Sequence, residues 1–145
     1  MADMSPSQIG RKRILIVEDD RDAAGLMSVI LRKKGYEVTV SEDGRAGLIM
    51  SASHRPDAIL LDLNMPCMSG FEFLTLRQEF PVLGRVPVIV LTASHRDEDI
   101  ERATALGAAD YVTKPVEYAA LLHCLEKHVP LPGDTPPVPG TLSLH

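Results

Sequence analysis

Three short apolar segments and a fourth short segment of this chain are each followed by side chains that can bind a cation or a phosphoryl group. An apolar run of this length is typical of a strand buried on both faces. In an open parallel sheet, the carboxyl ends of such strands share the edge where ligands bind. The segments and their following residues are 14–17 with Glu18, Asp19 and Asp20; 58–61 with Asp62; 88–91 with Thr92; and 111–113 with Lys114. We therefore predict one site at this edge, centred on Asp62.

The acidic residues of this site predict a bound cation. Carboxylates this close together repel one another unless a cation or protons intervene. Oxygen ligands suit Mg²⁺, which commonly uses one or two carboxylates and keeps several waters. The expected ligands are Asp19, Asp62 and the backbone carbonyl of Asn64, with Glu18 holding a metal-bound water. Mn²⁺ prefers similar ligands and is an expected substitute.

The same residues can transfer a phosphoryl group. A carboxylate can attack phosphorus and form an aspartyl phosphate. The transferring group carries negative charge on its equatorial oxygens. Asp62 is therefore the predicted phosphoacceptor, Lys114 would neutralise the charge together with the cation, and Thr92 would donate a hydroxyl hydrogen bond.

Each of these residues also has an ordinary structural explanation. The acids at 18–20 can cap a helix, where the helix dipole favours negative charge. Thr92 can begin a helix, and Lys114 can be a solvated lysine. Asp62 is harder to explain in this way, because burying a lone acid at a strand end is costly. The arrival of all four groups at successive strand ends favours a functional site.

The segments that position these residues alternate between strands and helices. We expect strands at 14–17, 36–40, 58–62, 88–92 and 111–113, and helices at about 21–34, 44–53, 70–79, 97–106 and 117–128. Five successive βα units predict an α/β fold, (βα)5, with a doubly wound parallel five-stranded sheet and helices on both faces.

Apolar spacing and capping residues refine the expected helices. Ala46, Ile49 and Met50 are expected to form the inner face of the second helix, and Phe71 and Leu74 that of the third. Ser69 with Glu72 resembles a capping box, and Ser94 with Asp97 predicts a helix start. Gly35 and Gly107 are expected to end the first and fourth helices.

Length and composition indicate one domain with two tails. We expect a loose N-terminal segment at 1–12, the domain at 13–129 and a tail or linker at 130–145, where five of sixteen residues are proline. The net charge of −5 argues against a nucleic-acid-binding surface. Neither a secretory signal nor a membrane span is recognisable, so a cytoplasmic protein is expected. Cys67 and Cys124 are expected to be reduced thiols.

The motifs resemble those of response-regulator receiver domains of two-component signalling. The matching segments are 14–20, 61–66 with Gly70, 90–93 and 107–115, in order and over roughly residues 12–129. The resemblance implies a flavodoxin-like fold with strand order 2-1-3-4-5. It implies Asp62 as phosphoacceptor, Glu18 and Asp19 as the acidic metal pair, and Lys114 as the phosphate partner. Thr92 would be the switch hydroxyl and Tyr111 the switch aromatic.

The function expected from this resemblance is a phosphorylation-dependent switch rather than a metabolic enzyme. A domain of this kind catalyses only its own phosphoryl transfer and dephosphorylation. The phosphoryl donor would be a sensor histidine kinase or a histidine phosphotransfer protein. Phosphorylation would change the face made by the fourth helix, fifth strand and fifth helix. That face would bind a downstream protein or effector domain, and dimerisation on phosphorylation is compatible with this scheme.

Two other functions were weighed against this one. A Mg²⁺-dependent phosphatase or phosphotransferase of the haloacid-dehalogenase group needs a second Asp two residues after the nucleophile, where this chain has Asn64. A flavodoxin-like FMN carrier needs a phosphate loop after the first strand, where the acids at 18–20 would repel the phosphate. Whether the protein acts alone or is a fragment of a longer protein stays open.

Overall fold

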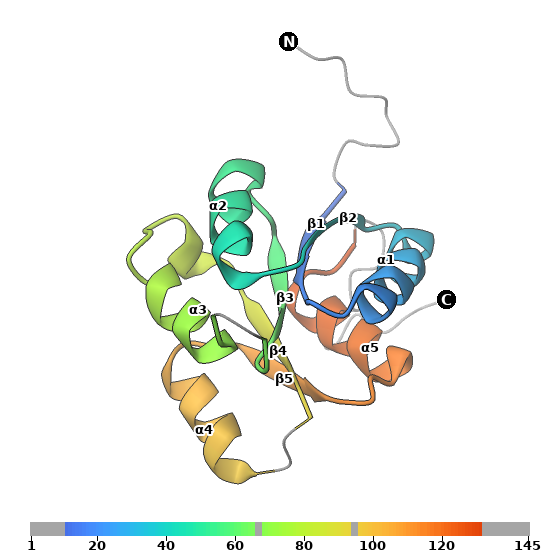
Figure 1. Cartoon of the computed structure of the whole chain (residues 1–145). Helices are drawn as coiled ribbons and strands as arrows, with labels where there is room; N and C mark the ends of the chain where they lie inside the picture. Colours follow the sequence, from blue (N-terminus) through green and yellow to red (C-terminus); the bar gives the residue numbers. More distant parts are fainter. Residues whose placement is uncertain (1–10, 66–67, 94–95, 132–145) are drawn as a thin grey trace, which may run out of the picture.

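The computed structural model describes residues 11–65, 68–93 and 96–131. Strands and helices alternate along the chain (Figure 1), and one 3₁₀ turn, η1, precedes the fourth strand. The elements are β1 (Arg13–Val17), α1 (Arg21–Lys34), β2 (Glu37–Ser41), α2 (Gly44–His54), β3 (Ala58–Asp62), α3 (Gly70–Arg77), η1 (Leu83–Arg85), β4 (Val88–Thr92), α4 (Asp97–Ala105), β5 (Asp110–Thr113) and α5 (Tyr118–His128).

All five strands form one parallel sheet in the order β2-β1-β3-β4-β5. Both the fold class and the strand order expected from the sequence are therefore confirmed. β3 lies at the centre, and all five of its residues are buried. Its neighbours are in register, with Val17 paired to Leu61 on one side and Leu91 paired to Asp62 on the other. The carboxyl ends of these strands consequently meet at one edge of the sheet.

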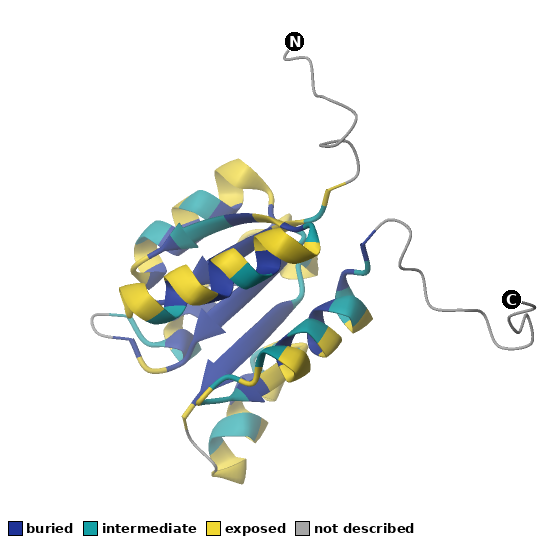
Figure 2. Cartoon of the chain, turned by 90° about the vertical axis from the view of Figure 1, so that its right-hand side faces the viewer, coloured by how far each residue is buried: buried dark blue, intermediate teal, exposed yellow. Residues whose placement is uncertain are grey.

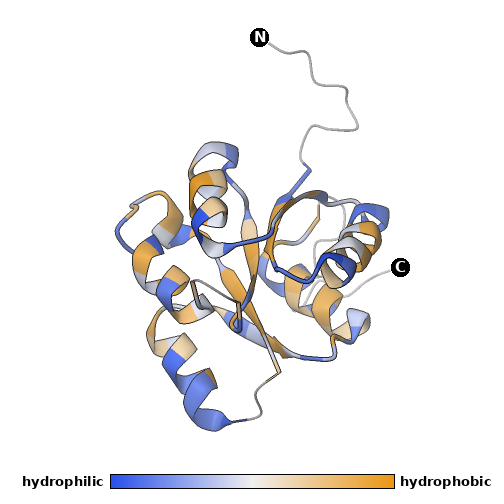
Figure 3. Cartoon of the chain, viewed as in Figure 1, coloured by the Kyte–Doolittle hydropathy of each residue, from blue (hydrophilic) through white to orange (hydrophobic). Residues whose placement is uncertain are grey.

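Helices cover both faces of the sheet. Helices α1 and α5 lie on one face and α2, α3 and α4 on the other (Figure 1). Alternate strand residues serve the two faces: Ile14 and Ile16 pack in the core under α1 and α5, and Leu15 and Val17 in the core under the other helices. The inner strands β1, β3 and β4 are largely buried and hydrophobic, the edge strands β2 and β5 are only partly buried, and the outer faces of the helices are exposed (Figures 2 and 3). In the described part of the chain, none of the helices has the length and apolar character needed to cross a membrane.

The first helix begins and ends as its sequence predicts. The Asp20 side chain accepts hydrogen bonds from the backbone amides of Asp22 and Ala23, which satisfies two orphan donors of the first turn. Gly35 ends the helix with φ 119°, a left-handed conformation that glycine adopts without penalty. Asp20 therefore has a structural role, in agreement with one of the explanations considered for the acidic segment.

The predicted inner face of α2 is wrong at Ile49, whereas Met50 is partly buried and packs against the core. Ile49 is 66% exposed, and the buried positions are Gly44, Gly47, Leu48 and Ser51. Both sets of residues have helical spacing, so periodicity alone did not distinguish them. A Cβ atom on Gly47 would lie 2.9 Å from Val17 Cγ2, so the glycine allows the helix to approach β1 closely. Two glycines, Gly44 and Gly47, therefore belong to the packing surface of this helix.

The third and fourth helices depart from expectation in detail. Leu74 is buried as predicted. The second buried apolar residue of the helix is Phe73 and not the predicted Phe71, which is only partly buried and packs against the Arg102 guanidinium. Ser69 caps α3 by accepting a hydrogen bond from the Glu72 amide. Helix α4 begins after Arg96 without a side-chain cap, and the predicted cap Ser94 lies outside the described residues.

The core extends two residues beyond the predicted domain boundary at 129. Leu131 is 8% exposed and belongs to the core under α1 and α5, although the segment from residue 130 was expected to stay outside it. Leu131 lies beside Gly35, where an added Cβ would be 3.5 Å from the Leu131 side chain. The proline-rich composition after residue 129 gave no indication of this apolar contact.

Gly70 provides a test of this packing. A Cβ atom at Gly70 would lie 2.6 Å from Leu63 Cα and 2.9 Å from the Asp62 carbonyl oxygen, both backbone atoms. Backbone cannot rotate away, so we expect Gly70→Ala to lower the free energy of unfolding by about 1–3 kcal/mol. Gly25→Ala is the matched control, because nothing lies within 4 Å of its added Cβ. It should raise stability by about 0.4–1 kcal/mol. Chemical denaturation measures both, and equal effects would contradict the packing described.

Candidate functional site

The three acidic side chains of the predicted site lie at the ends of two neighbouring strands. Glu18 follows β1 directly, and its amide donates a hydrogen bond to the Ser41 carbonyl of β2. Asp62 is the last residue of β3. Glu18 and Asp62 are almost fully buried, at 1% and 2% exposure, whereas Asp19 is exposed. At this edge of the sheet, two acidic side chains are therefore buried and the third is exposed to solvent.

Lys114 joins the two buried acids. Its Nζ lies 3.1 Å from Asp62 Oδ1 and 3.3 Å from each carboxylate oxygen of Glu18. The backbone amide of Lys114 donates to the Thr92 carbonyl at 2.8 Å, which fixes the residue at the end of β4 and β5. The contact with Glu18 was not part of the sequence prediction, which assigned Lys114 only to the phosphoryl group. The lysine thus neutralises part of the charge that the sheet has buried.

The charges in this cluster are not balanced by Lys114 alone. Burial, followed by the hydrogen bond and the charge of Asp62, raises the pKa of Glu18 to about 7, against the opposing effect of Lys114. Burial lowers the pKa of Lys114, but the charges of Asp62 and Glu18 outweigh it and raise this pKa. Three carboxylates and one amine leave an excess of negative charge. A bound proton, or a cation in addition to Lys114, is therefore needed to hold these side chains close together.

The donor set fits a hard divalent cation. Glu18, Asp19 and Asp62 each offer a carboxylate oxygen, and these oxygens lie within 4.8 Å of one another. All-oxygen ligands with few protein contacts are typical of Mg²⁺ sites, which retain waters. Asp19 is open to solvent, so an ion has a path into the cluster. The metal site predicted at these acids stays a prediction, and the structure places their oxygens close enough together to share one ion.

The remaining predicted residues surround Asp62 at different depths. Asn64 is exposed, and its amide donates to Asp62 Oδ1 at 3.0 Å, which orients the carboxylate. Thr92, the last residue of β4, is fully buried. Tyr111 on β5 is 44% exposed. Among the predicted site residues, direct side-chain contacts join Glu18, Asp62 and Lys114.

Two predicted loop residues cannot be placed in this way. Cys67, five residues after Asp62, lies outside the described residues, as does Ser94, two residues after Thr92. Cys124 is a buried free cysteine.

Comparison with known proteins gives the same assignment as the geometry. The model of the response regulator receiver domain family matches residues 14–126. Protein PilH of Pseudomonas aeruginosa is 33% identical over 110 residues, which cover 76% of this chain and 91% of PilH. Transcriptional regulatory protein PrrA of Mycobacterium tuberculosis is 37% identical over 110 residues, 76% of this chain, and the match spans 46% of PrrA. The chain thus spans about half the length of such longer relatives.

Solved structures show the same similarity. Chemotaxis protein CheY4 of Vibrio cholerae superposes with a TM-score of 0.79 at 31% identity, covering 82% of this chain and 99% of CheY4. The receiver domain of sensor histidine kinase PA1611 from Pseudomonas aeruginosa has a magnesium ion in its active site cleft. It superposes with a TM-score of 0.75 at 32% identity, covering 81% of this chain and 97% of that domain. By sequence, fold and the arrangement of its acidic site, the chain belongs to the response regulator receiver domain family, the signalling domains of two-component systems.

Proposed function

We propose that this domain is switched by phosphorylation of Asp62. The observation that carries the proposal is the contact of Lys114 Nζ with both Asp62 and Glu18, beside the exposed Asp19. A nucleophilic carboxylate, an amine that can pair with a phosphoryl oxygen and an acidic metal pair are thereby assembled in one place. The phosphoryl donor would be a histidine kinase or a histidine phosphotransfer protein.

Each of the site residues would have its own role in the phosphoryl transfer. An Asp62 oxygen attacks phosphorus while the P–N bond to the donor histidine breaks. The bonding electrons stay on the imidazole, which takes up one proton and leaves neutral. Lys114 would pair with the negatively charged phosphoryl oxygens, and Thr92 would donate its hydroxyl hydrogen to one of them. Water would later hydrolyse the acyl phosphate, so the domain acts on itself rather than on a metabolite.

The expected cofactor is Mg²⁺, with Mn²⁺ as a substitute. Glu18, Asp19 and Asp62 would hold it together with the backbone carbonyl of Asn64. When bound, it neutralises charge on the transferring phosphoryl group. The magnesium ion in the active site cleft of the PA1611 receiver domain supports this assignment.

Residues 13–129 would form the receiver domain, to whose core Leu131 adds, with 1–12 and the remainder of 130–145 as flanking segments. Its partners would be the phosphoryl donor and a downstream protein or effector domain. We propose no direct nucleic-acid binding by this domain, because its net charge is −5. Dimerisation on phosphorylation is part of this scheme and is measured by the mass of the phosphorylated protein in solution.

The test of the function is incubation of the full chain with a small acyl phosphate and Mg²⁺. A switch accumulates one phosphoryl group per chain and releases phosphate only at the decay rate of that form. A phosphatase of the competing class would instead turn over many equivalents without accumulating product. An absorbance spectrum of the purified protein tests the FMN carrier directly. Sustained turnover or a flavin spectrum would overturn the proposal.

Tyr111 is expected to change position when the site is phosphorylated. It is now 44% exposed on the edge strand β5, where Val90 of β4 is its neighbour. Movement of Thr92 toward a phosphoryl oxygen would open space at the end of β4. An amphipathic tyrosine ring can then turn inward, and the face of α4, β5 and α5 changes with it.

The chain supplies a control for this movement among its own tyrosines. Tyr36 is 1% exposed and its hydroxyl donates to the Val129 carbonyl, so its environment should not change. We expect the Tyr111 ring signals in an NMR spectrum to shift when a phosphoryl mimic such as beryllofluoride binds. Tyr111→Phe identifies those signals. Unshifted Tyr111 signals with the mimic bound would mean that the change leaves the site by another route.

A further inference from the structure

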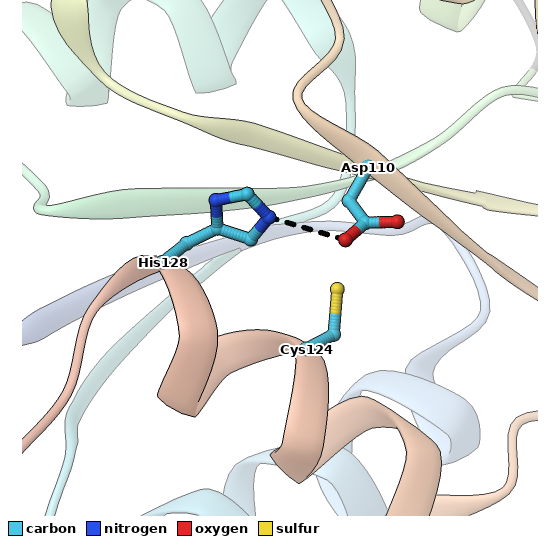
Figure 4. Close-up of side chains that lie close together, drawn as sticks. All are labelled: Asp110, Cys124 and His128. Atoms are coloured by element: carbon cyan, nitrogen blue, oxygen red, sulfur yellow. Dashed lines mark hydrogen bonds and ion pairs between the residues drawn. The ribbon is translucent and has the colours of Figure 1, made fainter. Parts of the chain in front are cut away.

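A second group of metal-ligating side chains lies at the opposite end of β5 from Lys114. Asp110 is the first residue of β5, and Cys124 and His128 belong to the last turns of α5. Residues four apart on a helix share one face, and Figure 4 shows Cys124 and His128 both directed toward Asp110. The sequence analysis did not identify this group, because the strand that completes it is fourteen residues away along the chain.

The three side chains are already close to the geometry of a metal site. One ligand atom of each, the carboxylate oxygen, the sulfur and the ring nitrogen, lies within 4.8 Å of the others. His128 Nε2 is 3.1 Å from Asp110 Oδ2. Tetrahedral Zn²⁺ with bonds of about 2.0–2.3 Å places its ligand atoms roughly 3.3–3.7 Å apart. Small side-chain movements would therefore be enough to receive the ion.

We propose that Asp110, Cys124 and His128 form a binding site for Zn²⁺, separate from the magnesium site around Asp62. Sulfur and imidazole ligands favour Zn²⁺ over Mg²⁺, which prefers oxygen. Three protein ligands leave the fourth position for a water molecule. An open cavity of about 420 Å³, lined in part by Asp110, Cys124 and Lys127, gives the ion access.

The protonation states define the binding reaction. Burial, followed by the hydrogen bond and charge of Asp110, raises the pKa of Cys124 to about 12, so the thiol is protonated at neutral pH. Burial raises the pKa of Asp110, but hydrogen bonds from Lys127, the Tyr111 amide and His128 outweigh it, and the pKa is lowered. On binding, the Cys124 S–H bond breaks, its proton goes to solvent and the sulfur electron pair forms the bond to Zn²⁺. Asp110 donates a carboxylate lone pair. Without the ion, His128 Nε2 donates its hydrogen to Asp110, so on binding this hydrogen leaves to solvent, Nδ1 carries the ring hydrogen, and the Nε2 lone pair forms the bond to Zn²⁺.

Lys127 competes with the ion in this arrangement. Its Nζ lies 3.0 Å from Asp110 Oδ2, the same oxygen that contacts His128. The Lys127 side chain is 58% exposed, so it can move into solvent when the ion binds. Removing this amine with Lys127→Met should tighten Zn²⁺ binding, because the carboxylate oxygen is then available to the metal.

The test uses the full chain in excess Mg²⁺, which saturates the site around Asp62, and carries Cys67→Ser so that only one thiol remains. Co²⁺ is added as a spectroscopic substitute for Zn²⁺, and Zn²⁺ affinity is measured by competition with a chromophoric chelator. We expect a sulfur-to-cobalt charge-transfer band that Zn²⁺ removes. Cys124→Ser should abolish the band, and His128→Asn should weaken Zn²⁺ binding by more than the roughly 10–100-fold that loss of an outer-shell partner costs.

His54→Asn is the matched control, because His54 is an exposed histidine on α2 that is neither one of the three ligands nor part of the lining of the cavity. It should leave the band and the affinity unchanged. His128→Asn and Lys127→Met alter partly or largely exposed side chains, so they test the site even if Cys124→Ser fails to fold. Absence of the cobalt band in the Cys67→Ser protein, or Zn²⁺ affinity unaffected by His128→Asn, would overturn the proposal.

Discussion

Asp62→Asn is expected to abolish phosphoryl incorporation from a small acyl phosphate, with no added phosphoryl mass above background. The amide has nearly the shape of the carboxylate but lacks the negative oxygen that attacks phosphorus. Asp62 is 2% exposed and its carboxylate contacts Lys114, so we expect no other side chain to replace it as phosphoacceptor. Intact-protein mass spectrometry after incubation with Mg²⁺ and the donor measures the effect.

Asp20→Asn is the matched control for this substitution. Asp20 belongs to the same acidic segment, but it caps α1 and is exposed. Asparagine caps helices about as well as aspartate, so the fold should be retained. We expect Asp20→Asn to incorporate one phosphoryl group at close to the rate of the unmodified chain. Persistent incorporation in Asp62→Asn, or loss of incorporation in Asp20→Asn, would contradict the assignment of the phosphoacceptor.

Asp19→Ala is expected to remove metal-dependent phosphorylation. Asp19 is the exposed member of the oxygen cluster, so its loss affects the metal site with little effect on the core. Loss of a direct ligand should weaken Mg²⁺ binding by at least the roughly 10–100-fold that loss of an outer-shell partner costs. The rate of phosphoryl incorporation as a function of Mg²⁺ concentration measures this effect.

Asp22→Ala separates the loss of a ligand from the loss of a surface charge. Asp22 is an exposed acid in the first turn of α1 and is not part of the oxygen cluster. Its replacement should leave the Mg²⁺ dependence almost unchanged, since exposed charges are screened by solvent and salt. Phosphorylation that continues undiminished in excess chelator, in the unmodified chain, would show that the site works without a divalent cation.

The fold could be predicted from the sequence because its three inner strands are short, largely continuous apolar runs bounded by polar or turn residues. Segment 58–62 is the clearest case, and all five of its residues are buried. Alternation of such runs with helical spacing implies a parallel sheet with helices on both faces. The same reasoning predicts Glu18, Asp62 and Lys114 at one edge of the sheet, because each lies at the end of a predicted strand.

The details that could not be predicted depend on distances between elements. In α2, two stripes of equal periodicity compete, and the close approach to Val17 selects the one containing Gly47 rather than Ile49. The contact of Lys114 with Glu18 joins residues 96 positions apart. Leu131 packs in the core beside Gly35, a contact between residues far apart in the chain that no local pattern reveals. Each depends on tertiary packing rather than on local sequence.

The most direct test of the account is to locate the phosphoryl group in the unmodified chain. Borohydride reduction of the phosphorylated protein converts an aspartyl phosphate into homoserine, and peptide mass spectrometry then identifies the modified position. We predict homoserine at position 62 alone. Homoserine at position 19 or 20 in place of 62, or a phosphoryl group resistant to reduction on another side chain, would contradict the central claim that Asp62 is the switch of this domain.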